Sequence, residues 1–551
     1  MGFLGSIASS ARQSVSDAAF EARVLREAGI VGLSRPDTIA KVAATFIRWG
    51  ASPATGIATA AHKYPHETYV IDERGSLSFE RVHRRTNALA SAFAEMGIGY
   101  GDGVGIMCRN HRGFVEATLA AAKLGASALY LNTMFAGPQL VEVVRREEPK
   151  ALVYDEEFAT LLDGVDEGVE RVVAWTDGDG DGQRTIDSLV AAHDDSNHRP
   201  PPDKPRFVIL TSGTTGTPKG AQRSSPDGLL AMAALIDKIP YRARETMMIA
   251  APLFHSWGFF HFVMSLPTAS TIVLRRRFDE EETLRAVQDH RAQVLAVVPV
   301  MLQRILRLPE ETLRAYDLSS LRIASASGSA LPGELAIEWM DRFGDNVYNL
   351  YGSTEVAYAT VATPEDLRAA PGTAGRPPRG TVVRLYDEAG REVAPGEVGR
   401  IFVGNEMSFE GYTGGGGKEV IDGLLSSGDV GHIDSSGRLF IDGRDDEMIV
   451  SGGENVFPRE VEDLLADHGD VVEVAVVGVE DEEFGQRLKA FVVIAAEASV
   501  SEEELKAHVK TNLAAYKAPR EIEFLEELPR NATGKILKRE LREKADKSTS
   551  R

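Results

Sequence analysis

The alternation of apolar and polar residues predicts strands and helices in turn along most of the chain. Apolar residues recur at helical spacing in several segments, and short apolar runs separate these segments. The predicted helices are Val82–Glu95, Gly113–Leu124 and Pro138–Arg146, and the predicted strands are Tyr69–Asp72, Leu77–Phe79, Gly103–Met107, Ala128–Leu131 and Ala151–Tyr154. A second series of this kind runs from about residue 228 to residue 340. Such regular alternation predicts an α/β fold in which helices flank parallel sheets.

The pattern changes twice toward the C-terminus. From near Gly372, glycines and prolines separate short strands, which predicts a small β-rich subdomain. After residue 443 the pattern becomes that of an α+β module, with a helix that Ser501 and Glu504 begin as a capping box. We therefore predict a large N-terminal domain, residues 56–443, made of two strand–helix subdomains and the β-rich subdomain. A mobile α+β domain, residues 444–551, is expected to follow it.

The first 55 residues are alanine-rich, and Ile39, Val42, Ala43 and Phe46 have helical spacing. This spacing predicts a helical lead-in that packs on the body of the protein. A helix that faces a membrane is the alternative interpretation.

Length and charge limit the classes of protein that fit. A chain of 551 residues is too long for one core. Its net charge of −21 argues against nucleic acid or an anionic membrane as the main partner. The single cysteine, Cys108, excludes an internal disulfide and lies in an apolar run typical of a core. No apolar run approaches the length of a membrane span. We expect a cytoplasmic protein that does not insert into membranes, with weak peripheral association and homo-oligomerisation left open.

One glycine-rich loop stands out for its chemistry. The stretch Leu210–Gly220, LTSGTTGTPKG, follows the apolar run Phe207–Leu210. Backbone N–H groups of such a loop can form a nest for anionic oxygens, and its hydroxyls and lysine add donors, so a triphosphate is the expected ligand. The order of residues excludes a Walker loop and a dinucleotide fingerprint. The candidate phosphate-binding residues are Thr211, Ser212, Gly213, Thr214, Thr215, Gly216 and Lys219.

The string TSGTTGTPKG resembles the phosphate-binding signature of the adenylate-forming superfamily, which comprises acyl-CoA synthetases, peptide-synthetase adenylation domains and luciferases. Further strings that match the family's motifs follow in chain order: APLFHSWGF at 251–259, ASGSAL at 326–331, YGSTE at 351–355, SGD at 427–429, SGGENVFP at 451–458 and PRNATGKI at 529–536. The resemblance covers nearly everything after residue 55, and it implies ATP, Mg²⁺ and coenzyme A as ligands.

The resemblance also implies a role for each matching residue around the nucleotide. Tyr351 would offer a flat face to the adenine, and Asp429 would accept hydrogen bonds from both ribose hydroxyls. Thr354 would donate to a phosphate, and Glu355 would provide an oxygen ligand to Mg²⁺. The other residues implied to contact the nucleotide are Gly328, Ser329, Ala330, Asn349, Gly352 and Arg444.

Residues of the C-terminal domain would complete the site. Asp446 corresponds to the family's hinge, and Ser451, Gly452 and Gly453 match the loop that lines the pantetheine tunnel. Lys535 matches the lysine that bridges the substrate carboxylate and the α-phosphate. An attack of a carboxylate on a phosphate brings two anions together, so a desolvated ammonium between them lowers the barrier.

The segment that matches the family's acid pocket indicates the substrate class. His255 stands in this segment, where peptide-synthetase domains tend to carry an aspartate, and Trp257, Phe259 and Phe260 would supply apolar walls. We expect a carboxylate–CoA ligase for a medium- or long-chain fatty acid, with His255 orienting the carboxylate or gating the pocket. An aryl acid, a carrier-protein acceptor and a luciferase-type reaction are the alternatives. A non-catalytic binding protein is disfavoured because Glu355, Asp429 and Lys535 are all present.

Overall fold

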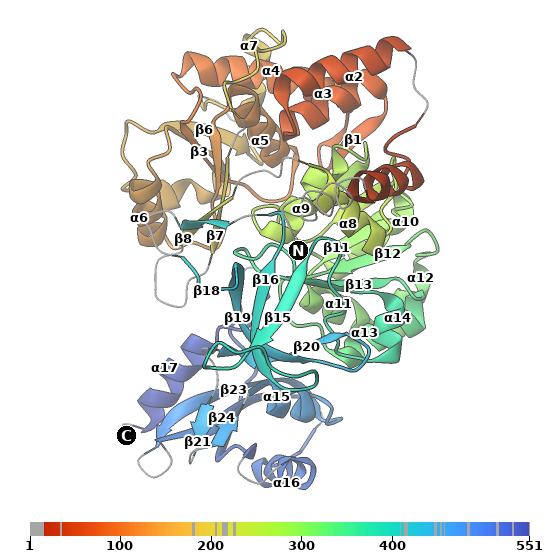
Figure 1. Ribbon diagram of the computed structural model, residues 1–551. Coiled ribbons are helices and arrows are strands. Elements are labelled where there is room, and N and C mark those ends of the chain that lie inside the picture. Colours follow the sequence, from red (N-terminus) through yellow and green to blue (C-terminus); the bar gives the residue numbers. More distant parts are fainter. Residues whose placement is uncertain are drawn as a thin grey trace.

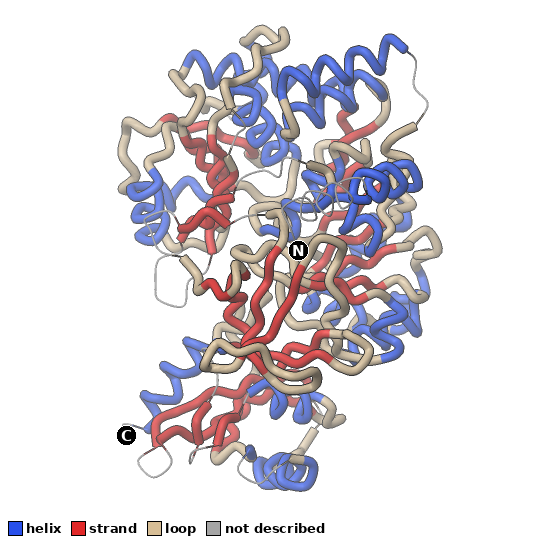
Figure 2. The backbone as a smooth tube through the Cα atoms, in the orientation of Figure 1, coloured by secondary structure: helices blue, strands red, loops and turns tan. Residues whose placement is uncertain are grey.

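The computed structural model describes residues 16–32, 36–178, 182–203, 206–211, 219–223, 228–407, 409–412, 417–445, 449–451, 454–456, 458–481, 485–496, 498–513, 517–531 and 534–549. In these residues the chain forms sheets of eight, seven, five and five strands (Figures 1 and 2). The first three sheets belong to a large N-terminal domain. The last belongs to a small α+β domain, which lies at the bottom of Figure 1.

The eight-stranded sheet is built mainly from the second strand–helix series. Its strands run in the order β14 (Thr360–Ala362), β13 (Val347–Tyr351), β12 (Ile323–Ala326), β11 (Val294–Val297), β9 (Thr246–Ile249), β10 (Thr271–Leu274), β1 (Thr68–Asp72) and β2 (Gly75–Ser78). Every neighbouring pair is parallel except those at the two ends, β14 with β13 and β1 with β2. The helices between these strands are α8 (Leu230–Lys238), α9 (Ser256–Ser265), α10 (Glu280–Asp289), α11 (Pro299–Leu306), α12 (Glu310–Ala315), α13 (Gly333–Phe343) and α14 (Pro364–Ala369).

The seven-stranded sheet holds the first strand–helix series. Its order is β17 (Phe409–Tyr412), β8 (Lys219–Arg223), β7 (Phe207–Thr211), β4 (Ser127–Tyr130), β3 (Gly103–Met107), β5 (Ala151–Asp155) and β6 (Glu170–Trp175). The helices of this subdomain are α2 (Pro36–Trp49), α3 (Pro53–Lys63), α4 (Phe79–Glu95), α5 (Arg112–Leu124), α6 (Gly137–Glu147), η1 (Glu156–Leu162) and α7 (Ile186–Ala192). The predicted elements between residues 69 and 154 are thus confirmed, with ends shifted by a few residues.

Aromatic side chains join the two large sheets into one core. Phe114 of α5 stacks on Tyr130 of β4 at 5.1 Å between ring centroids, and it meets Phe262 of α9 edge-on at 6.3 Å. All three side chains are buried. Helices α5 and α9 therefore pack together between the sheets, and α9 is held from both sides.

The β-rich subdomain is antiparallel, as the glycine-rich and proline-rich sequence predicts. Its strands run in the order β15 (Val382–Tyr386), β16 (Gly399–Gly404), β19 (Leu424–Ile433) and β18 (Val420–Ile421), and β20 (Leu439–Arg444) also pairs with β19. Strand β17 lies between β16 and β18 in the chain, but it pairs with β8 of the seven-stranded sheet. This one strand therefore connects the β-rich subdomain to the hairpin that brackets the phosphate loop.

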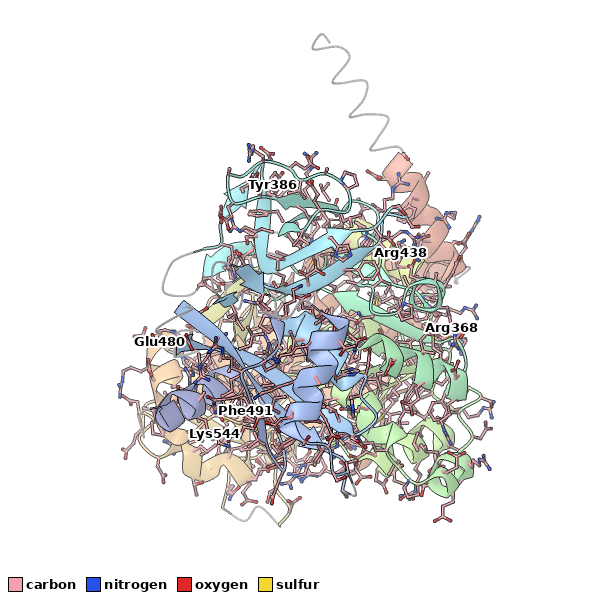
Figure 3. All side chains as sticks on the ribbon, turned by 90° about the horizontal axis from the view of Figure 1, so that it is seen from below. Arg368, Tyr386, Arg438, Glu480, Phe491 and Lys544 are labelled. Atoms are coloured by element: carbon pink, nitrogen blue, oxygen red, sulfur yellow. The ribbon has the colours of Figure 1, made fainter. Side chains whose placement is uncertain are left out.

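The C-terminal domain contains β22 (Glu454–Val456), β21 (Ile449–Ser451), β24 (Gly485–Ile494) and β23 (Val471–Asp481), and β25 (Glu521–Phe524) pairs with β24. Its helices are α15 (Pro458–Ala466), α16 (Glu502–Asn512) and α17 (Lys538–Thr549). The predicted capping box is confirmed, because the Ser501 hydroxyl accepts from the Glu504 N–H and the Glu504 carboxylate accepts from the Ser501 N–H. Figure 3 shows α17 against this sheet, where the Lys544 ammonium lies 6.0 Å from the centre of the Phe491 ring.

The prediction that the lead-in packs on the body is confirmed for residues 16–27, a helix whose Phe20, Val24 and Leu25 are buried in the core. For the apolar residues of α2 it is wrong. Ile39 and Phe46 are 53% and 48% exposed, and only Val42 of the apolar set, together with Thr38, Thr45 and Trp49, is half-buried. The helix α2 contacts α3 through the face that carries the half-buried Val42 and Trp49. This face is rotated away from Ile39 and Phe46. Within the described residues, no helix combines the length and the hydropathy that crossing a bilayer requires.

Candidate active site

A buried carboxylate marks one end of the candidate site. Asp429 of β19 lies opposite Arg444 of β20 in the antiparallel register, and its Oδ1 is 3.5 Å from the Arg444 Nε. The Tyr351 hydroxyl, at the end of β13, donates to Asp429 Oδ2 at 2.6 Å. Burial raises the pKa of Asp429, while the charges of Arg444, Lys535 and Lys418 and the hydrogen bond from Tyr351 oppose the rise. This arrangement brings three predicted nucleotide residues together and leaves a carboxylate that suits a vicinal diol.

The neighbouring Asn349, on β13, adds an amide side chain at this end. Its side-chain Oδ1 is buried and has no hydrogen-bond partner among the described residues. A buried acceptor without a donor destabilises a protein by about 1–3 kcal/mol, so such atoms usually meet a ligand or water. An exocyclic amine of a purine would supply the missing donor. The geometry thus fits the adenine contact that the sequence implies for Asn349.

Two glycines shape the backbone around this acceptor. A Cβ on Gly352 would lie 2.2 Å from the carbonyl oxygen of Ala357, so only glycine allows the turn to fold back on itself. Gly328 has φ of +95°, and a Cβ there would lie 3.4 Å from Val298. Ser329 is half-buried and Ala330 is exposed beside it. These are the residues that the family resemblance implies to lie against the adenine.

Glu355 is held in a defined orientation as an anion. The Tyr412 hydroxyl donates to its Oε1 at 2.7 Å, and the Ser353 hydroxyl donates to its Oε2 at 2.9 Å. Burial acts to raise the pKa of Glu355, but these hydrogen bonds and the charge of Lys418 outweigh burial, so that its pKa lies below the usual value. An ionised carboxylate with fixed oxygens suits Mg²⁺, which takes one or two carboxylates together with phosphate oxygens.

Tyr412 was not predicted from the sequence, and its replacement provides a test of its role. We expect Tyr412→Phe to raise the Mn²⁺ concentration that gives half-maximal ATP binding by about three- to tenfold. The reason is that Glu355 loses a donor that fixes its orientation. Calorimetric titration of ATP at several Mn²⁺ concentrations measures this dependence without turnover. Tyr386→Phe is the matched control, because it removes a hydroxyl that donates to Asp422 within the β-rich subdomain. Equal cation dependence in wild type and Tyr412→Phe would exclude the role.

His255 lies at the start of α9 and is a neutral imidazole. Its Nε2 is buried with no hydrogen-bond partner among the described residues, and burial lowers the pKa of His255 to about 4. The next residue, Ser256, has its hydroxyl 3.4 Å from the hydroxyl of Thr354. The start of α9 therefore lies beside the turn that carries Thr354 and Glu355. A neutral, unpartnered imidazole nitrogen at this place can hydrogen-bond a substrate carboxylate.

The three predicted pocket aromatics do not form one group. Trp257 and Phe260 stack with 5.4 Å between centroids, and the Trp257 Nε1 donates to the carbonyl oxygen of Ser325. Phe259 points to the other side of α9, where it contacts Tyr130 at 4.8 Å and Phe207 at 5.3 Å. This separation follows from helix geometry, because residues i and i+2 face different directions whereas i and i+3 share a face.

Lys535 reaches the site from the C-terminal domain. Its charge opposes the rise that burial causes in the pKa of Asp429, so the two groups act on each other across the domain boundary. The preceding Gly534 has φ of +77°, and a Cβ there would lie 2.3 Å from Val300 of α11. Asn531 holds the loop, because its side-chain oxygen accepts from the Lys535 N–H at 2.9 Å. The loop that carries Lys535 is therefore docked against the N-terminal domain.

Several predicted residues lie outside the described part of the chain: Ser212, Gly213, Thr214, Thr215, Gly216, Asp446, Gly452 and Gly453, together with the side chains of Thr211, Lys219 and Ser451. The strands that flank the phosphate loop are described. They form an antiparallel hairpin in which the backbone of Thr211 pairs with that of Lys219.

Lys418, like Tyr412, was missed by sequence reasoning. Its ammonium would lie 3.2 Å from a Cβ on Gly428, beside Arg444, and its charge acts on both Asp429 and Glu355. Tyr412 ends β17 and Lys418 precedes β18, and neither lies in a distinctive sequence motif. Only the departure of β17 from its own subdomain brings this segment to the site.

Known proteins match nearly the whole chain. Residues 57–413 match the family described as AMP-binding enzyme, and residues 460–535 match the AMP-binding enzyme C-terminal domain. The indoleacetate–CoA ligase of Aromatoleum aromaticum is 32% identical over 497 residues, which cover 88% of this chain and 96% of that protein. The fatty acid–[acyl-carrier-protein] ligase ScoC of Streptomyces coeruleorubidus is 30% identical, with 88% and 94% covered.

A solved structure agrees with both the fold and the domain order. ATP-bound MatB from Rhodopseudomonas palustris superposes with a TM-score of 0.79 at 27% identity, over 89% of this chain and 98% of that chain. The family matches account for both domains, and the described site residues bring a buried carboxylate, an oriented glutamate and a lysine from the second domain together. The chain therefore belongs to the adenylate-forming superfamily of AMP-binding enzymes and is an acid–thiol ligase.

Proposed function

We propose that the chain is an ATP-dependent acyl-CoA synthetase for a medium- or long-chain fatty acid. In the first half-reaction a carboxylate oxygen attacks the α-phosphorus of ATP, the bond to pyrophosphate breaks, and acyl-AMP forms. In the second, the thiolate of coenzyme A attacks the acyl carbon and AMP leaves. The observation that carries the proposal is the docking of the Lys535 loop beside the site of Asp429 and Asn349.

The described residues suit the first half-reaction. Lys535 would place positive charge between the carboxylate and the α-phosphate, where negative charge accumulates. Neutral His255 would hydrogen-bond the carboxylate through its unpartnered nitrogen. Asn349 and Asp429 would hold the adenine and the ribose. Glu355 would hold Mg²⁺, and that ion would neutralise phosphate charge when bound.

The second half-reaction requires the C-terminal domain to move, with Asp446 as the proposed hinge. This motion would withdraw Lys535 and bring the loop of Ser451, Gly452 and Gly453 toward the pantetheine arm. Before this motion, an ionic bridge between the two domains stabilises the arrangement in which the Lys535 loop is docked. Glu473 of β23 lies 3.0 Å from the Arg530 guanidinium and 3.8 Å from that of Arg307, which follows α11 in the N-terminal domain. Breaking the bridge would favour departure of the domain.

This bridge predicts a selective defect in Glu473→Gln. Because partly exposed ion pairs contribute about 0.5–1 kcal/mol, we expect adenylate formation to slow about two- to fivefold. Thioester formation from supplied acyl-AMP is expected to keep its rate or to increase. Rapid-quench measurement of each half-reaction gives the two rates. Glu480→Gln, at the exposed end of the same strand, is the matched control. An equal decrease of both rates would contradict the proposed bridge.

The stacked pair Trp257–Phe260 supports an uncharged acyl tail, since it offers an apolar wall on α9. The relatives include ligases named for both a fatty acid and an aryl-acetic acid. Pyrophosphate release with Mg·ATP, measured over a panel of fatty, aryl and amino acids, tests the substrate class. Highest kcat/KM for an aryl or amino acid would overturn the fatty-acid assignment.

A carrier-protein acceptor is the second candidate, because ScoC is named as a fatty acid–[acyl-carrier-protein] ligase. Both candidates share the adenylate. Consumption of the preformed adenylate by free coenzyme A, followed as AMP release, supports the CoA ligase. Consumption only by a phosphopantetheinylated carrier protein would support the second candidate.

A further inference from the structure

Four buried residues around α9 form a closed circuit of hydrogen bonds. The indole N–H of Trp257 donates to the carbonyl oxygen of Ser325 in β12 at 3.2 Å. The Tyr241 hydroxyl lies 2.9 Å from the Ser325 hydroxyl and 3.0 Å from the Nε2 of His261. The His261 Nδ1 lies 2.9 Å from the carbonyl oxygen of Trp257, which closes the circuit. We call Tyr241, Trp257, His261 and Ser325, all of them buried, the α9 network.

The carbonyl oxygen of Trp257 determines the direction of the hydrogen bonds in the α9 network. A carbonyl can only accept, so the His261 Nδ1 carries the proton. Burial lowers the pKa of His261 to about 4, so the imidazole is neutral and its Nε2 accepts from the Tyr241 hydroxyl. The Ser325 hydroxyl then donates to the Tyr241 oxygen. Each donor therefore has one defined acceptor, and no charged group takes part.

The α9 network connects the proposed acid pocket to the strand that leads to the adenine. Ser325 pairs in parallel register with Ala296 on one side and Tyr348 on the other, so the sheet fixes its backbone. Gly328, which the family resemblance implies to lie against the base, follows three residues later. At the other end of the network is the indole of Trp257, a proposed wall of the acid pocket. Its hydrogen bond to Ser325 holds this wall at a fixed distance from the adenine loop.

Ring packing adds to the restraint on Trp257. The His261 ring lies edge-on to Trp257 at 4.5 Å and to Phe260 at 5.2 Å, with interplanar angles of 88° and 87°. Trp257 and Phe260 are stacked nearly parallel, with an angle of 5°. Rotation of the indole would break the stack, the edge contact and the hydrogen bond together. A fully satisfied buried network of this kind restricts its side chains to one arrangement.

We propose that Tyr241 and His261 are positioning residues for the acid, because the α9 network holds the indole of Trp257 in place before the acid binds. This inference rests on the proposed role of Trp257 as a wall of the acid pocket. Tyr241 and His261 are both fully buried, and they act through Trp257. A wall that is already ordered raises affinity, since binding then does not have to immobilise a side chain.

The variant Tyr241→Phe tests the proposal, because it removes the hydroxyl that His261 and Ser325 share. We expect the KM for the acid to rise about three- to tenfold, since the indole must then be ordered on binding. The KM for Mg·ATP and kcat are expected to stay within about twofold of wild type. Initial rates are measured with whichever acid has the highest kcat/KM, so an aryl substrate in place of a fatty acid leaves this test intact.

Tyr69→Phe is the matched control. The Tyr69 hydroxyl is also fully buried and bonds to α9, but at the far end of the helix, where it lies 3.2 Å from the Ser265 hydroxyl. This variant is expected to lower the thermal unfolding temperature to a similar extent and to leave the KM for the acid unchanged. An equal rise of that KM in both variants would assign the effect to general loosening of α9 and overturn the proposal.

A spectroscopic measurement follows Trp257 without any substrate. The protein contains four tryptophans, so 5-fluorotryptophan labelling gives four ¹⁹F signals, and Trp257→Phe identifies the one that belongs to residue 257. We expect this signal to broaden or split in Tyr241→Phe and to stay sharp in Tyr69→Phe. An unchanged signal in Tyr241→Phe would overturn the proposal. A broadened signal with an unchanged KM for the acid would also overturn it, because Trp257 would then lie outside the acid pocket.

Discussion

Replacement of Lys535 by alanine is expected to slow acyl-adenylate formation by about 100- to 1,000-fold. The reason is electrostatic: in the docked arrangement the ammonium acts across the domain boundary on the Asp429 carboxylate, and the proposed transition state gathers negative charge beside it. Removal of one oriented donor from such a site has an effect of this size in other enzymes. Pyrophosphate release in a single turnover measures the adenylation rate.

The other half-reaction distinguishes catalysis from general damage. Thioester formation from supplied acyl-AMP is expected to stay within about twofold of wild type, because Lys535 is proposed to be withdrawn in that step. Lys538→Ala is the matched control, since this neighbouring lysine pairs with Glu462 within its own domain at 2.9 Å. An equal loss of both half-reactions in Lys535→Ala would contradict the assigned role.

Asp429→Asn is expected to raise the KM for ATP by at least about 30-fold with a smaller effect on kcat. The change removes the charge that Arg444 and Tyr351 orient and that is proposed to bind the ribose, and it leaves Arg444 with a weaker partner. Loss of one member of a buried, hydrogen-bonded charged pair weakens binding by about 2–5 kcal/mol. Initial rates over a range of Mg·ATP concentrations separate the two constants.

A control on the adjacent strand tests whether the effect is local. Asp442 of β20 pairs with His432 at 2.9 Å, so Asp442→Asn is expected to keep the KM of the wild type. Thermal unfolding of both variants reveals any loss of folding. A fall in kcat with an unchanged KM in Asp429→Asn would argue against ribose binding by this carboxylate.

The features that the sequence predicts well are those with a local signal. Strand–helix alternation predicts the parallel sheets because period and spacing reflect which face of each element is buried. The Ser501–Glu504 capping box is a contact between residues three apart, so the sequence alone suffices. The motif residues Asp429, Tyr351 and Glu355 were found through family resemblance. Of their hydrogen-bond partners, the resemblance indicates Tyr351 for Asp429 but not Tyr412 for Glu355.

Long-range contacts account for what was missed. Tyr412 and Glu355 are 57 residues apart, and they meet because β17 pairs outside its own subdomain, which no local pattern indicates. In α2 a clear local pattern leads to a wrong prediction of packing. Periodicity reveals an apolar face, but it does not show whether another element covers that face. For this reason Ile39 and Phe46 were predicted to pack inward, although both are exposed.

The unusual pairing of β17 also limits how this protein can be divided. Without residues 409–412, strand β8 would present an open row of N–H and C=O groups at the edge of the seven-stranded sheet, a known template for aggregation. A fragment that ends before residue 409 would therefore leave β8 as an unpaired edge strand. An exchange of the β-rich subdomain without the β7–β8 hairpin would have to rebuild this strand pairing.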